Sequence, residues 1–307
     1  MSKKILCMGA INIDLTMYAT CIPKPGETVV TDNFSTFPGG KGGNQAATIG
    51  KLGGTVAFFT KMGKDSFSNQ LKENLKDSGV DISPIIVSAG LTSGIAMIMV
   101  DANAQNSIMF TPGGNADLSV DDICQHEDLF SEYDILEITL EINPDVAYEA
   151  IRMAHKYDMT VVLDPSPMPI TGIPDRIANM IDYIKPNEIE AELLTGIPVK
   201  DEKSARKSLD SLIKKGFKHP ILTVGARGLY TYNDDETLIT LRPYPVTAID
   251  TTAAGDIFLG AFTVSLAQEK TFLECLEYAR AAASLSVTKK GAQTSIPTKE
   301  EINALLV

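Results

Sequence analysis

Short apolar runs recur along this chain. They are bounded mostly by Gly, Pro or Asp and lie at Ile5–Met8, Val56–Phe59, Thr160–Leu163, Tyr183–Lys185 and Ile221–Val224. Runs of this length and composition are typical of buried strands in a parallel sheet. The pattern therefore predicts a sheet whose strands are covered on both faces.

Between these runs, apolar residues follow a helical period. They recur at Phe67, Leu71 and Leu75, and again at Ala205, Leu209, Leu212 and Ile213. This spacing places each set on one face of a helix. Strands that alternate with helices build right-handed βαβ units around a parallel sheet. We therefore expect an α/β fold with a mostly parallel central sheet and helices on both of its faces.

Two stretches depart from this alternation. Residues 14–37 and 92–110 carry strand patterns with no helix between the paired runs. In the second stretch, Ile95–Val100 and Ser107–Phe110 flank the turn-prone segment Asp101–Ala104, which predicts a hairpin. We expect the two stretches to form a small β-sheet lid, inserted into a main domain of residues 1–13, 38–91 and 111–307.

Composition narrows the possible classes of function. The chain has 307 residues, of which 44% are hydrophobic, and a formal net charge of −12. This acidic balance disfavours nucleic-acid binding, which needs a basic surface. No signal peptide is evident, and no apolar stretch approaches the roughly 20 residues that a membrane helix needs. We therefore expect a cytoplasmic protein without a membrane partner.

The segment Asp250–Asp256 reads DTTAAGD and leads into an apolar stripe at Phe258 and Phe262. The stripe predicts a helix. A helix start presents unpaired amide N–H groups and the positive end of the helix dipole, and small residues let these amides approach a ligand. Such a start suits a transferring phosphoryl group. The candidate anion hole consists of Ala253, Ala254 and Gly255.

Asp256 falls at the predicted helix start. The helix dipole favours the ionised carboxylate, which could accept the proton of an attacking hydroxyl group during phosphoryl transfer. A simpler interpretation is that Asp256 only caps the helix. The complete DTTAAGD string favours the catalytic interpretation, so Asp256 is the candidate base.

A second glycine-rich segment, GGKGGNQAA, spans residues 39–47. It does not fit the P-loop pattern, because Gly42 follows Lys41 where Ser or Thr is required, and no GxGxxG fingerprint follows the first predicted strand. The glycines allow the backbone to approach a ligand closely. Lys41 and Asn44 add a cation and an amide suited to sugar hydroxyl groups. The alternative is a helix start with a flexible lead-in.

Together, the two strings resemble those of the PfkB family of carbohydrate kinases, and the resemblance covers essentially the whole chain. DTTAAGD is similar to the family signature DTxGAGD, with Ala253 and Ala254 in place of the common Gly-Ala. GGKGGNQA is similar to the GGKGxNQA string typical of the ribokinase branch. The resemblance implies a ribokinase-like fold and an ATP-dependent kinase that phosphorylates the primary hydroxyl of a pentose, with D-ribose as the leading candidate.

The resemblance also implies roles for individual residues. It implies that the sugar is held by Asn12, Asp14, Gly39, Gly40, Lys41, Asn44, Glu141 and Asp256. It implies that ATP is held by Asn187, Thr223, Gly225, Gly228 and Gly255. Glu190, in an NxxE motif with Asn187, would bind Mg2+ through water. Taken alone, Asn187 and Glu190 would also suit a helix cap and a solvated acid in the first turn.

A monovalent cation, usually K+, is a further implication of the resemblance. The matching positions are Asp250, Thr252, Ser286, Lys289, Gly291 and Ser295. Several of these would act through main-chain carbonyl groups, so that the identity of the side chain says little. The side chain of Lys289 itself has no ligand to offer a cation. The resemblance also implies a homodimer formed by the lid sheets, and the apolar run Ile95–Val100 suits such a contact.

Other functions remain open from the sequence. Within the same family, the substrate could be 2-deoxyribose or a nucleoside. A sugar-binding regulator without catalytic activity would retain the fold, but the intact Asp256 and NxxE motif argue against it. A nicotinamide-dependent oxidoreductase is disfavoured by the missing dinucleotide fingerprint.

Overall fold

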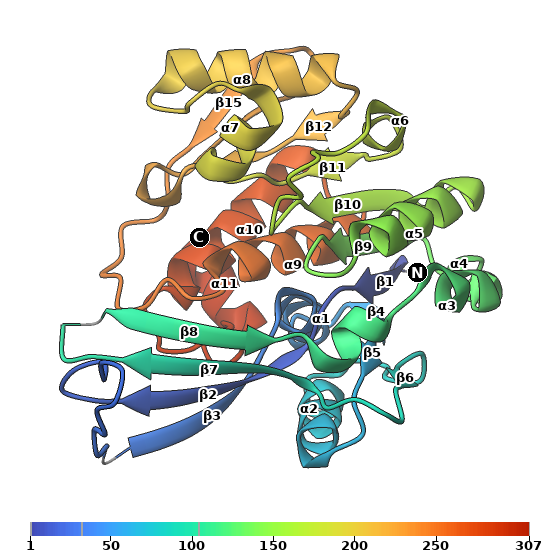
Figure 1. The fold of residues 1–307 in the computed structure, drawn as a ribbon. Coiled ribbons are helices and arrows are strands. Elements are labelled where there is room, and N and C mark those ends of the chain that lie inside the picture. Colours follow the sequence, from blue (N-terminus) through green and yellow to red (C-terminus); the bar gives the residue numbers. More distant parts are fainter. Residues whose placement is uncertain (1, 32, 104, 307) are drawn as a thin grey trace.

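The computed structural model describes residues 2–31, 33–103 and 105–306, so Met1, Asp32, Ala104 and Val307 lie outside the described residues. A six-stranded sheet in the order β12-β11-β10-β9-β1-β4 lies at its centre (Figure 1). All neighbouring strands in it are parallel. The strands are β1 (Lys4–Met8), β4 (Thr55–Phe59), β9 (Ile135–Thr139), β10 (Thr160–Asp164), β11 (Tyr183–Ile184) and β12 (His219–Pro220).

The central sheet separates two hydrophobic cores, because successive residues of a strand point to opposite faces. Ile5 and Cys7 of β1 enter one core, whereas Leu6 and Met8 enter the other. The first core is covered by α1 (Lys41–Lys51), α2 (Ser66–Asp77), α9 (Ala254–Ala267), α10 (Phe272–Ser286) and α11 (Lys299–Leu306). The second is covered by α3 (Val120–Gln125), α4 (Glu127–Phe130), α5 (Pro144–Lys156) and α6 (Asp175–Ala178).

A separate four-stranded sheet in the order β3-β2-β7-β8 extends from this body (Figure 1). Its strands are β2 (Asn12–Tyr18), β3 (Asn33–Gly39), β7 (Gly94–Val100) and β8 (Asn106–Thr111). β2 and β7 are parallel, and the other pairs are antiparallel. The predicted hairpin is confirmed in β7 and β8, although Ala104 of its turn lies outside the described residues. The predicted fold class is therefore confirmed.

The prediction of one parallel strand over Ile221–Val224 is wrong. The parallel neighbour of β11 is β12. Residues Leu222–Thr223 form β13, which pairs antiparallel with β14 (Leu229–Tyr232), and β15 (Leu238–Leu241) completes a three-stranded sheet. Helices α7 (Glu188–Thr195) and α8 (Glu202–Lys214) pack against this sheet in a small third core. The apolar run does not reveal the change of sheet, because both sheets bury their residues.

Short elements complete the chain. They are β5 (Lys61–Met62), β6 (Ile86–Val87) and the 3-10 turns η1 (Gly113–Asp117) and η2 (Gly225–Arg227). Among the described residues, no helix combines the length and the apolar character needed to cross a membrane.

The parallel strands bring polar residues to one edge of the central sheet. β9 is followed by Glu141, β10 ends at Asp164, and β11 is followed by Lys185. The carboxyl ends of parallel strands meet at the same edge, which is where open α/β sheets bind ligands. The candidate site lies at this edge.

Candidate active site

Helix α9 begins without a side-chain cap. Its N-cap residue, Ala253, has a left-handed backbone (φ 59°, ψ 10°) and makes no capping hydrogen bond. By contrast, α2, α3, α7, α8 and α10 each begin with a capping box. The amide of Ala254 donates to the Thr251 carbonyl at 3.3 Å, whereas those of Gly255 and Asp256 have no acceptor among the described residues. The predicted anion hole is thus an open helix start.

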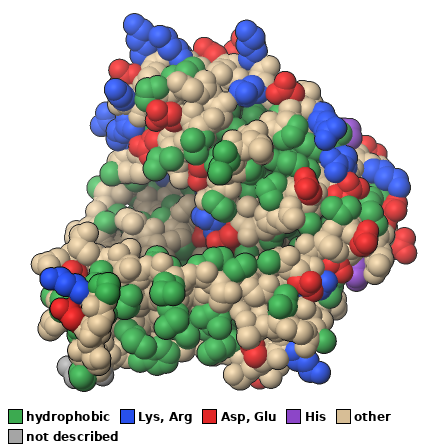
Figure 2. Space-filling view, in the orientation of Figure 1, with side chains coloured by type: hydrophobic (Ala, Val, Ile, Leu, Met, Phe, Trp, Pro, Cys, Tyr) green, Lys and Arg blue, Asp and Glu red, His purple; other side chains and the backbone are tan. Residues whose placement is uncertain are grey.

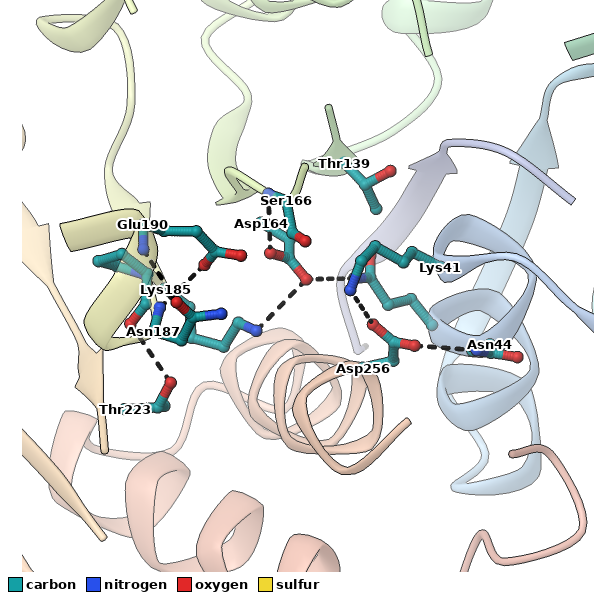
Figure 3. Close-up of polar contacts among 12 residues, drawn as sticks. Lys41, Asn44, Thr139, Asp164, Ser166, Lys185, Asn187, Glu190, Thr223 and Asp256 are labelled. Carbon is teal, nitrogen blue, oxygen red and sulfur yellow. Dashed lines mark hydrogen bonds and ion pairs between the residues drawn. The ribbon is translucent and has the colours of Figure 1, made fainter. Parts of the chain in front are cut away.

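Asp256 lies in the first turn of α9 and is only 4% exposed. Asn44 Nδ2 donates to its Oδ2 at 2.9 Å, and Lys41 Nζ lies 3.6 Å from its Oδ1 (Figure 3). The carboxylate raises the pKa of Lys41 above its usual range. Oδ1 accepts no hydrogen bond from a described residue. A buried carboxylate oxygen without a donor is costly, so this atom is suited to receive a hydroxyl group of a ligand.

Figure 2 shows a hollow between the four-stranded sheet and the main body of the molecule. β2 and β3 form one side of the site, and the starts of α1 and α9 form the other. The Lys41 side chain is 31% exposed beside the nearly buried Asp256. The carboxylate therefore lies just beneath the surface.

The four-stranded sheet supplies one group of the predicted sugar residues. Asn12 begins β2, and its Oδ1 accepts a hydrogen bond from Asn115 Nδ2 at 2.9 Å. Burial raises the pKa of Asp14, on the same strand, to about 6. Gly39 pairs with Asn12 across β3. A Cβ atom at Gly39 would lie 2.4 Å from Asp14 Oδ2, so Asp14 keeps its place only beside a glycine.

The turn into α1 supplies the second group. Gly40 has a φ of 83°, and a Cβ atom there would lie 2.7 Å from the Ala10 carbonyl oxygen. The amide of Lys41 donates to Glu141 Oε2 at 2.6 Å. Burial raises the pKa of Glu141 to about 7. Lys41 therefore links Glu141, through its amide, to Asp256, through its ammonium group.

Asn187 and Glu190 form a reciprocal cap at the start of α7. The amide of Glu190 donates to Asn187 Oδ1, and the amide of Asn187 donates to Glu190 Oε2, both at 2.9 Å. The helix-cap interpretation therefore holds for Asn187, whereas the interpretation of Glu190 as a solvated acid is wrong, because Glu190 is buried. Glu190 is also buried and turned toward Asp164 and Lys185 (Figure 3). Its Oε1 accepts no hydrogen bond from the part of the chain that the structure describes, so that oxygen fits the prediction of water-mediated Mg2+ binding.

The predicted nucleotide loop begins at Thr223, whose amide and hydroxyl group both donate to the Pro186 carbonyl, at 3.0 and 3.3 Å. Gly225 has a φ of 53°, and no heavy atom lies within 4 Å of a Cβ atom built there. Gly228 has a φ of 94°, and its Cβ atom would lie 1.9 Å from the Leu241 carbonyl oxygen. Gly225 therefore faces open space, whereas β15 requires a glycine at position 228.

Three of the predicted cation residues lie together. Asp250 Oδ1 accepts hydrogen bonds from the Thr252 amide at 2.9 Å and the Thr252 hydroxyl at 2.6 Å. Asp250 Oδ2 accepts one from the Gly291 amide at 2.9 Å. Oxygen donors of this kind suit a hard cation. The Asp250 carboxylate therefore fits the prediction of a monovalent cation at this position.

The remaining predicted cation residues direct their side chains to other partners. The hydroxyl group of Ser286 donates to the Ala283 carbonyl at 2.9 Å, and that of Ser295 donates to the Ala292 carbonyl at 2.7 Å. Lys289 Nζ pairs with Glu301 at 2.8 Å. These residues could contribute only main-chain or shared oxygen atoms.

Two charged residues that sequence reasoning missed lie inside the site. Lys185 Nζ is 3.3 Å from Asp164 Oδ2, and both side chains are buried. Gln45 Nε2 also donates to Asp164 Oδ2, at 3.2 Å. A Cβ atom at Gly255 would lie 3.1 Å from Lys185 Nζ, which places the ammonium group beside the open start of α9 (Figure 3). The available signal is a charged residue at the end of two apolar runs: Asp164 follows Thr160–Leu163, and Lys185 ends Tyr183–Lys185.

Glu137, on β9, is a third missed residue. It is 0% exposed, and neither carboxyl oxygen has a hydrogen-bond partner among the described residues. Burial raises its pKa to about 8; the Thr263 hydroxyl group, which lies close by without a well-formed hydrogen bond, lowers it, and the negative charges of Asp164 and Asp256 add to the increase. A neutral carboxylic acid therefore lies beneath the site at neutral pH.

Comparisons with known proteins agree with this geometry. The model of the pfkB family carbohydrate kinases matches residues 2–299. The ribokinase of Haemophilus influenzae is 39% identical over 301 residues, which cover 98% of this chain and 97% of that protein. The deoxyribokinase of Salmonella typhi is 34% identical over 303 residues, which cover 98% of each chain.

Solved structures extend the similarity to the whole fold. The ribokinase of Thermotoga maritima superimposes with a TM-score of 0.88 at 37% identity, over 99% of each chain. The ribokinase of Arabidopsis thaliana, solved in complex with ribose and ATP, gives a TM-score of 0.92 at 31% identity and covers 100% of this chain and 99% of that one. This chain therefore belongs to the PfkB family of carbohydrate kinases.

Proposed function

We propose that this enzyme transfers the γ-phosphoryl group of ATP to the primary hydroxyl group of D-ribose and forms D-ribose 5-phosphate. The observation that carries the proposal is the Oδ1 atom of Asp256, which accepts no hydrogen bond from a described residue and lies beside the open start of α9. A proton acceptor and an anion-binding helix start adjoin there, as phosphoryl transfer requires. The similarity to ribokinases supports ribose as the substrate.

In the proposed reaction, Asn12 and Asp14 bind sugar hydroxyl groups from the four-stranded sheet, with Gly39 leaving room for them. Gly40, Lys41, Asn44 and Glu141 bind from the opposite side. Asp256 accepts the proton of the attacking hydroxyl group, a new P–O bond forms at the γ-phosphorus, and the bond to the β-phosphate breaks to release ADP. Charge on the transferring group is stabilised first by the free amides of Gly255 and Asp256, and the backbone of Ala253 and Ala254 completes the proposed anion hole.

On the nucleotide side, we propose that Asn187, Thr223, Gly225, Gly228 and Gly255 contact ATP. Glu190 would hold Mg2+ through water, and the ion would neutralise charge on the phosphates. Asp250 and Thr252, with main-chain oxygen atoms at Ser286, Lys289, Gly291 and Ser295, would hold K+. The dependence of the enzyme on ATP fits a cytoplasmic location.

We further propose that residues 14–37 and 92–110 act as a lid that excludes water from the site and as the contact between two copies of the chain. The sheet exposes large apolar side chains on both of its faces, and exposed apolar surface of this kind is typical of protein contacts. Phe34, Met97 and Met109 share one face, whereas Tyr18, Ile108 and Phe110 share the other. Sedimentation equilibrium should show a dimer for the wild type and a monomer for a Met97→Asp/Met109→Asp variant. A wild-type monomer at micromolar concentration would contradict this proposal.

The test of the main proposal is sugar-dependent ATP consumption. We expect kcat/KM to be highest for ribose, and the deoxyribokinase relatives make 2-deoxyribose the second candidate. Asp256→Asn should lower kcat by at least about 10²-fold. Asp121→Asn, an exposed carboxylate in the first turn of α3, is the matched control. Undiminished turnover in Asp256→Asn, or a preference for a nucleoside, would refute the proposal as stated.

A further inference from the structure

The carboxylate of Asp256 is one end of a chain of side-chain amides. Asn44 Nδ2 donates to Asp256 Oδ2 at 2.9 Å, and Gln293 Nε2 donates to Asn44 Oδ1 at 3.2 Å. Asn74 Nδ2 in turn donates to Gln293 Oε1 at 2.5 Å. The chain joins α9, α1, the segment before α11, and α2. It thus connects the candidate base to a residue on a different helix, outside the predicted site.

All the amides in this chain point in the same direction. An amide has a donor end and an acceptor end, so the orientation of each group fixes that of the next. The Asp256 carboxylate can only accept, which requires Asn44 to present its NH2 group and leaves Asn44 Oδ1 facing Gln293. Asn44 is 6% exposed and Gln293 is 3% exposed. Since bulk water does not reach them freely, a reversed amide would leave buried groups unpaired.

Gln293 is also held from its backbone. Lys51 Nζ, on α1, donates to the Gln293 main-chain oxygen at 2.7 Å. Both ends of the Gln293 side chain are therefore occupied, one by Asn44 and one by Asn74, while its main chain is tied to the helix that carries Asn44. This arrangement leaves the side chain little freedom to turn over.

We propose that Gln293 is a positioning residue for Asp256, acting through the amide of Asn44, and that Asn74 fixes the orientation of Gln293. When an acceptor replaces the Gln293 donor, two acceptors compete for the single NH2 group of Asn44, so that Asn44 can turn this group away from Asp256. The carboxylate then loses a donor and turns away from the attacking hydroxyl group. This inference rests on the proposed function, because it takes Asp256 as the base.

Gln293→Glu tests the direction of the hydrogen bonds in this series of side-chain amides. At neutral pH, the introduced carboxylate cannot donate to Asn44 Oδ1, whereas its protonated form can. The charged group facing it is Lys51 of α1; Asn44 of α1 and Asn74 of α2 are neutral. Asp256 itself is paired with Lys41, and it interacts at longer range with Glu137, Glu141 and Cys7. We expect kcat to fall by about 10-fold or more near pH 7.5 and to recover toward the wild-type value as the pH is lowered.

Two matched variants separate positioning from simple packing. Gln70→Glu makes the same change at an exposed position of α2 and should leave kcat at every pH unchanged. Asn74→Asp removes the donor to Gln293 at a partly exposed position, and it provides the second test if Gln293→Glu does not fold. Asn69→Asp, exposed on the same helix, is its control. We expect Asn74→Asp to lower kcat by about 5-fold with a smaller change in the KM for ribose.

The experiment measures pH profiles of kcat for these variants beside the wild type and Asp256→Asn. A pH-dependent loss in Gln293→Glu or in Asn74→Asp, absent from both controls, supports the inference. If the wild type is active and Asp256→Asn is inactive, but the Gln293 and Asn74 variants keep wild-type kcat or lose it equally at every pH, only this inference is overturned. A wild type without sugar-dependent ATP consumption overturns the proposed function and this inference with it.

Discussion

Lys185 Nζ lies 3.3 Å from Asp164 Oδ2 at the carboxyl edge of the central sheet, and both side chains are buried. A buried ion pair is costly unless further hydrogen bonds complete it. Asp164 has such partners in Gln45 Nε2 and the Ser166 amide. Lys185 donates to no second acceptor among the described residues, although an ammonium group has three donors. It therefore has donors left for a phosphoryl oxygen near Gly255.

Removing the Lys185 charge should separate the effect of this residue on stability from its effect on catalysis. Lys185→Met leaves Asp164 buried without its cation and should cost about 3 kcal/mol of unfolding free energy. The double variant Asp164→Asn/Lys185→Met removes both charges and should recover most of that stability. Its kcat should nevertheless remain about 10²-fold below that of the wild type. Urea unfolding and steady-state kinetics measure the two quantities, and recovery of kcat in the double variant would reduce Lys185 to a structural residue.

Glu137 should make stability fall with increasing pH. Its pKa is raised to about 8 in the folded protein, so the folded state binds more protons than the unfolded chain between the ordinary glutamate pKa and about 8. The favourable protonation is complete at low pH and is lost as the pH rises through that window. Glu137→Gln should therefore gain on the order of 3 kcal/mol relative to the wild type between about pH 5 and about pH 8.

Urea unfolding of both proteins across that range measures the difference. Glu192→Gln, an exposed substitution on α7, should follow the wild type at each pH. Parallel stability curves for wild type and Glu137→Gln would show that Glu137 does not retain its proton on folding.

Ribose binding should tighten as the pH rises. Burial raises the pKa of Asp14 to about 6 and that of Glu141 to about 7, so both carboxyl groups ionise within the experimental range. Each ionised group accepts hydroxyl hydrogen bonds that its protonated form accepts less well. The KM for ribose should fall by about tenfold between about pH 5.5 and about pH 8. Asp14→Asn should flatten the acidic part of that profile and Glu141→Gln the neutral part; a pH-independent KM in the wild type would exclude both groups as acceptors.

The two glycines of the nucleotide loop should respond differently to alanine. Gly225→Ala meets open space but keeps a left-handed backbone, which costs about 1 kcal/mol. Gly228→Ala combines an unfavourable φ of 94° with a Cβ atom 1.9 Å from the Leu241 oxygen, and it should cost more than about 3 kcal/mol. Thermal unfolding measures the difference, and equal losses would show that β15 moves aside at no cost.

The spacing of apolar residues, together with the Gly, Pro and Asp residues that bound the apolar runs, is enough to predict most of the fold. The apolar run at Ile5–Met8 and the stripe at Phe67, Leu71 and Leu75 appear as β1 and α2. The apolar pattern does not predict β9, because Glu137 and Thr139 interrupt it although both are buried. The run at Ile221–Val224 was assigned to the wrong sheet, since burial alone does not specify which neighbour a strand takes.

The residues of the candidate site likewise fall into those that the sequence predicts and those that only the fold reveals. Residues within the glycine-rich strings, such as Lys41, Asn44 and Asp256, were found because the chemistry lies in a contiguous motif. The structure also brings them into contact. Lys185 and Gln293 act on partners that are distant in the sequence, and the bond between Gln293 and Asn44 spans 249 positions. One sequence contains no record of such pairings, so only the fold could reveal them.

Asn12 and Asp14 belong to β2, whereas Lys41, Asn44 and Asp256 belong to helices on the central sheet. The affinity for a ligand that contacts both the β2 residues and the helix residues depends on the angle between the two sheets. The two effects are thermodynamically reciprocal. A contact that favours one orientation of the sheets raises the affinity for the ligand by a given factor, and the bound ligand favours that orientation by the same factor. If two chains associate through the four-stranded sheet, their association and the binding of a ligand in the hollow beneath this sheet would therefore strengthen each other.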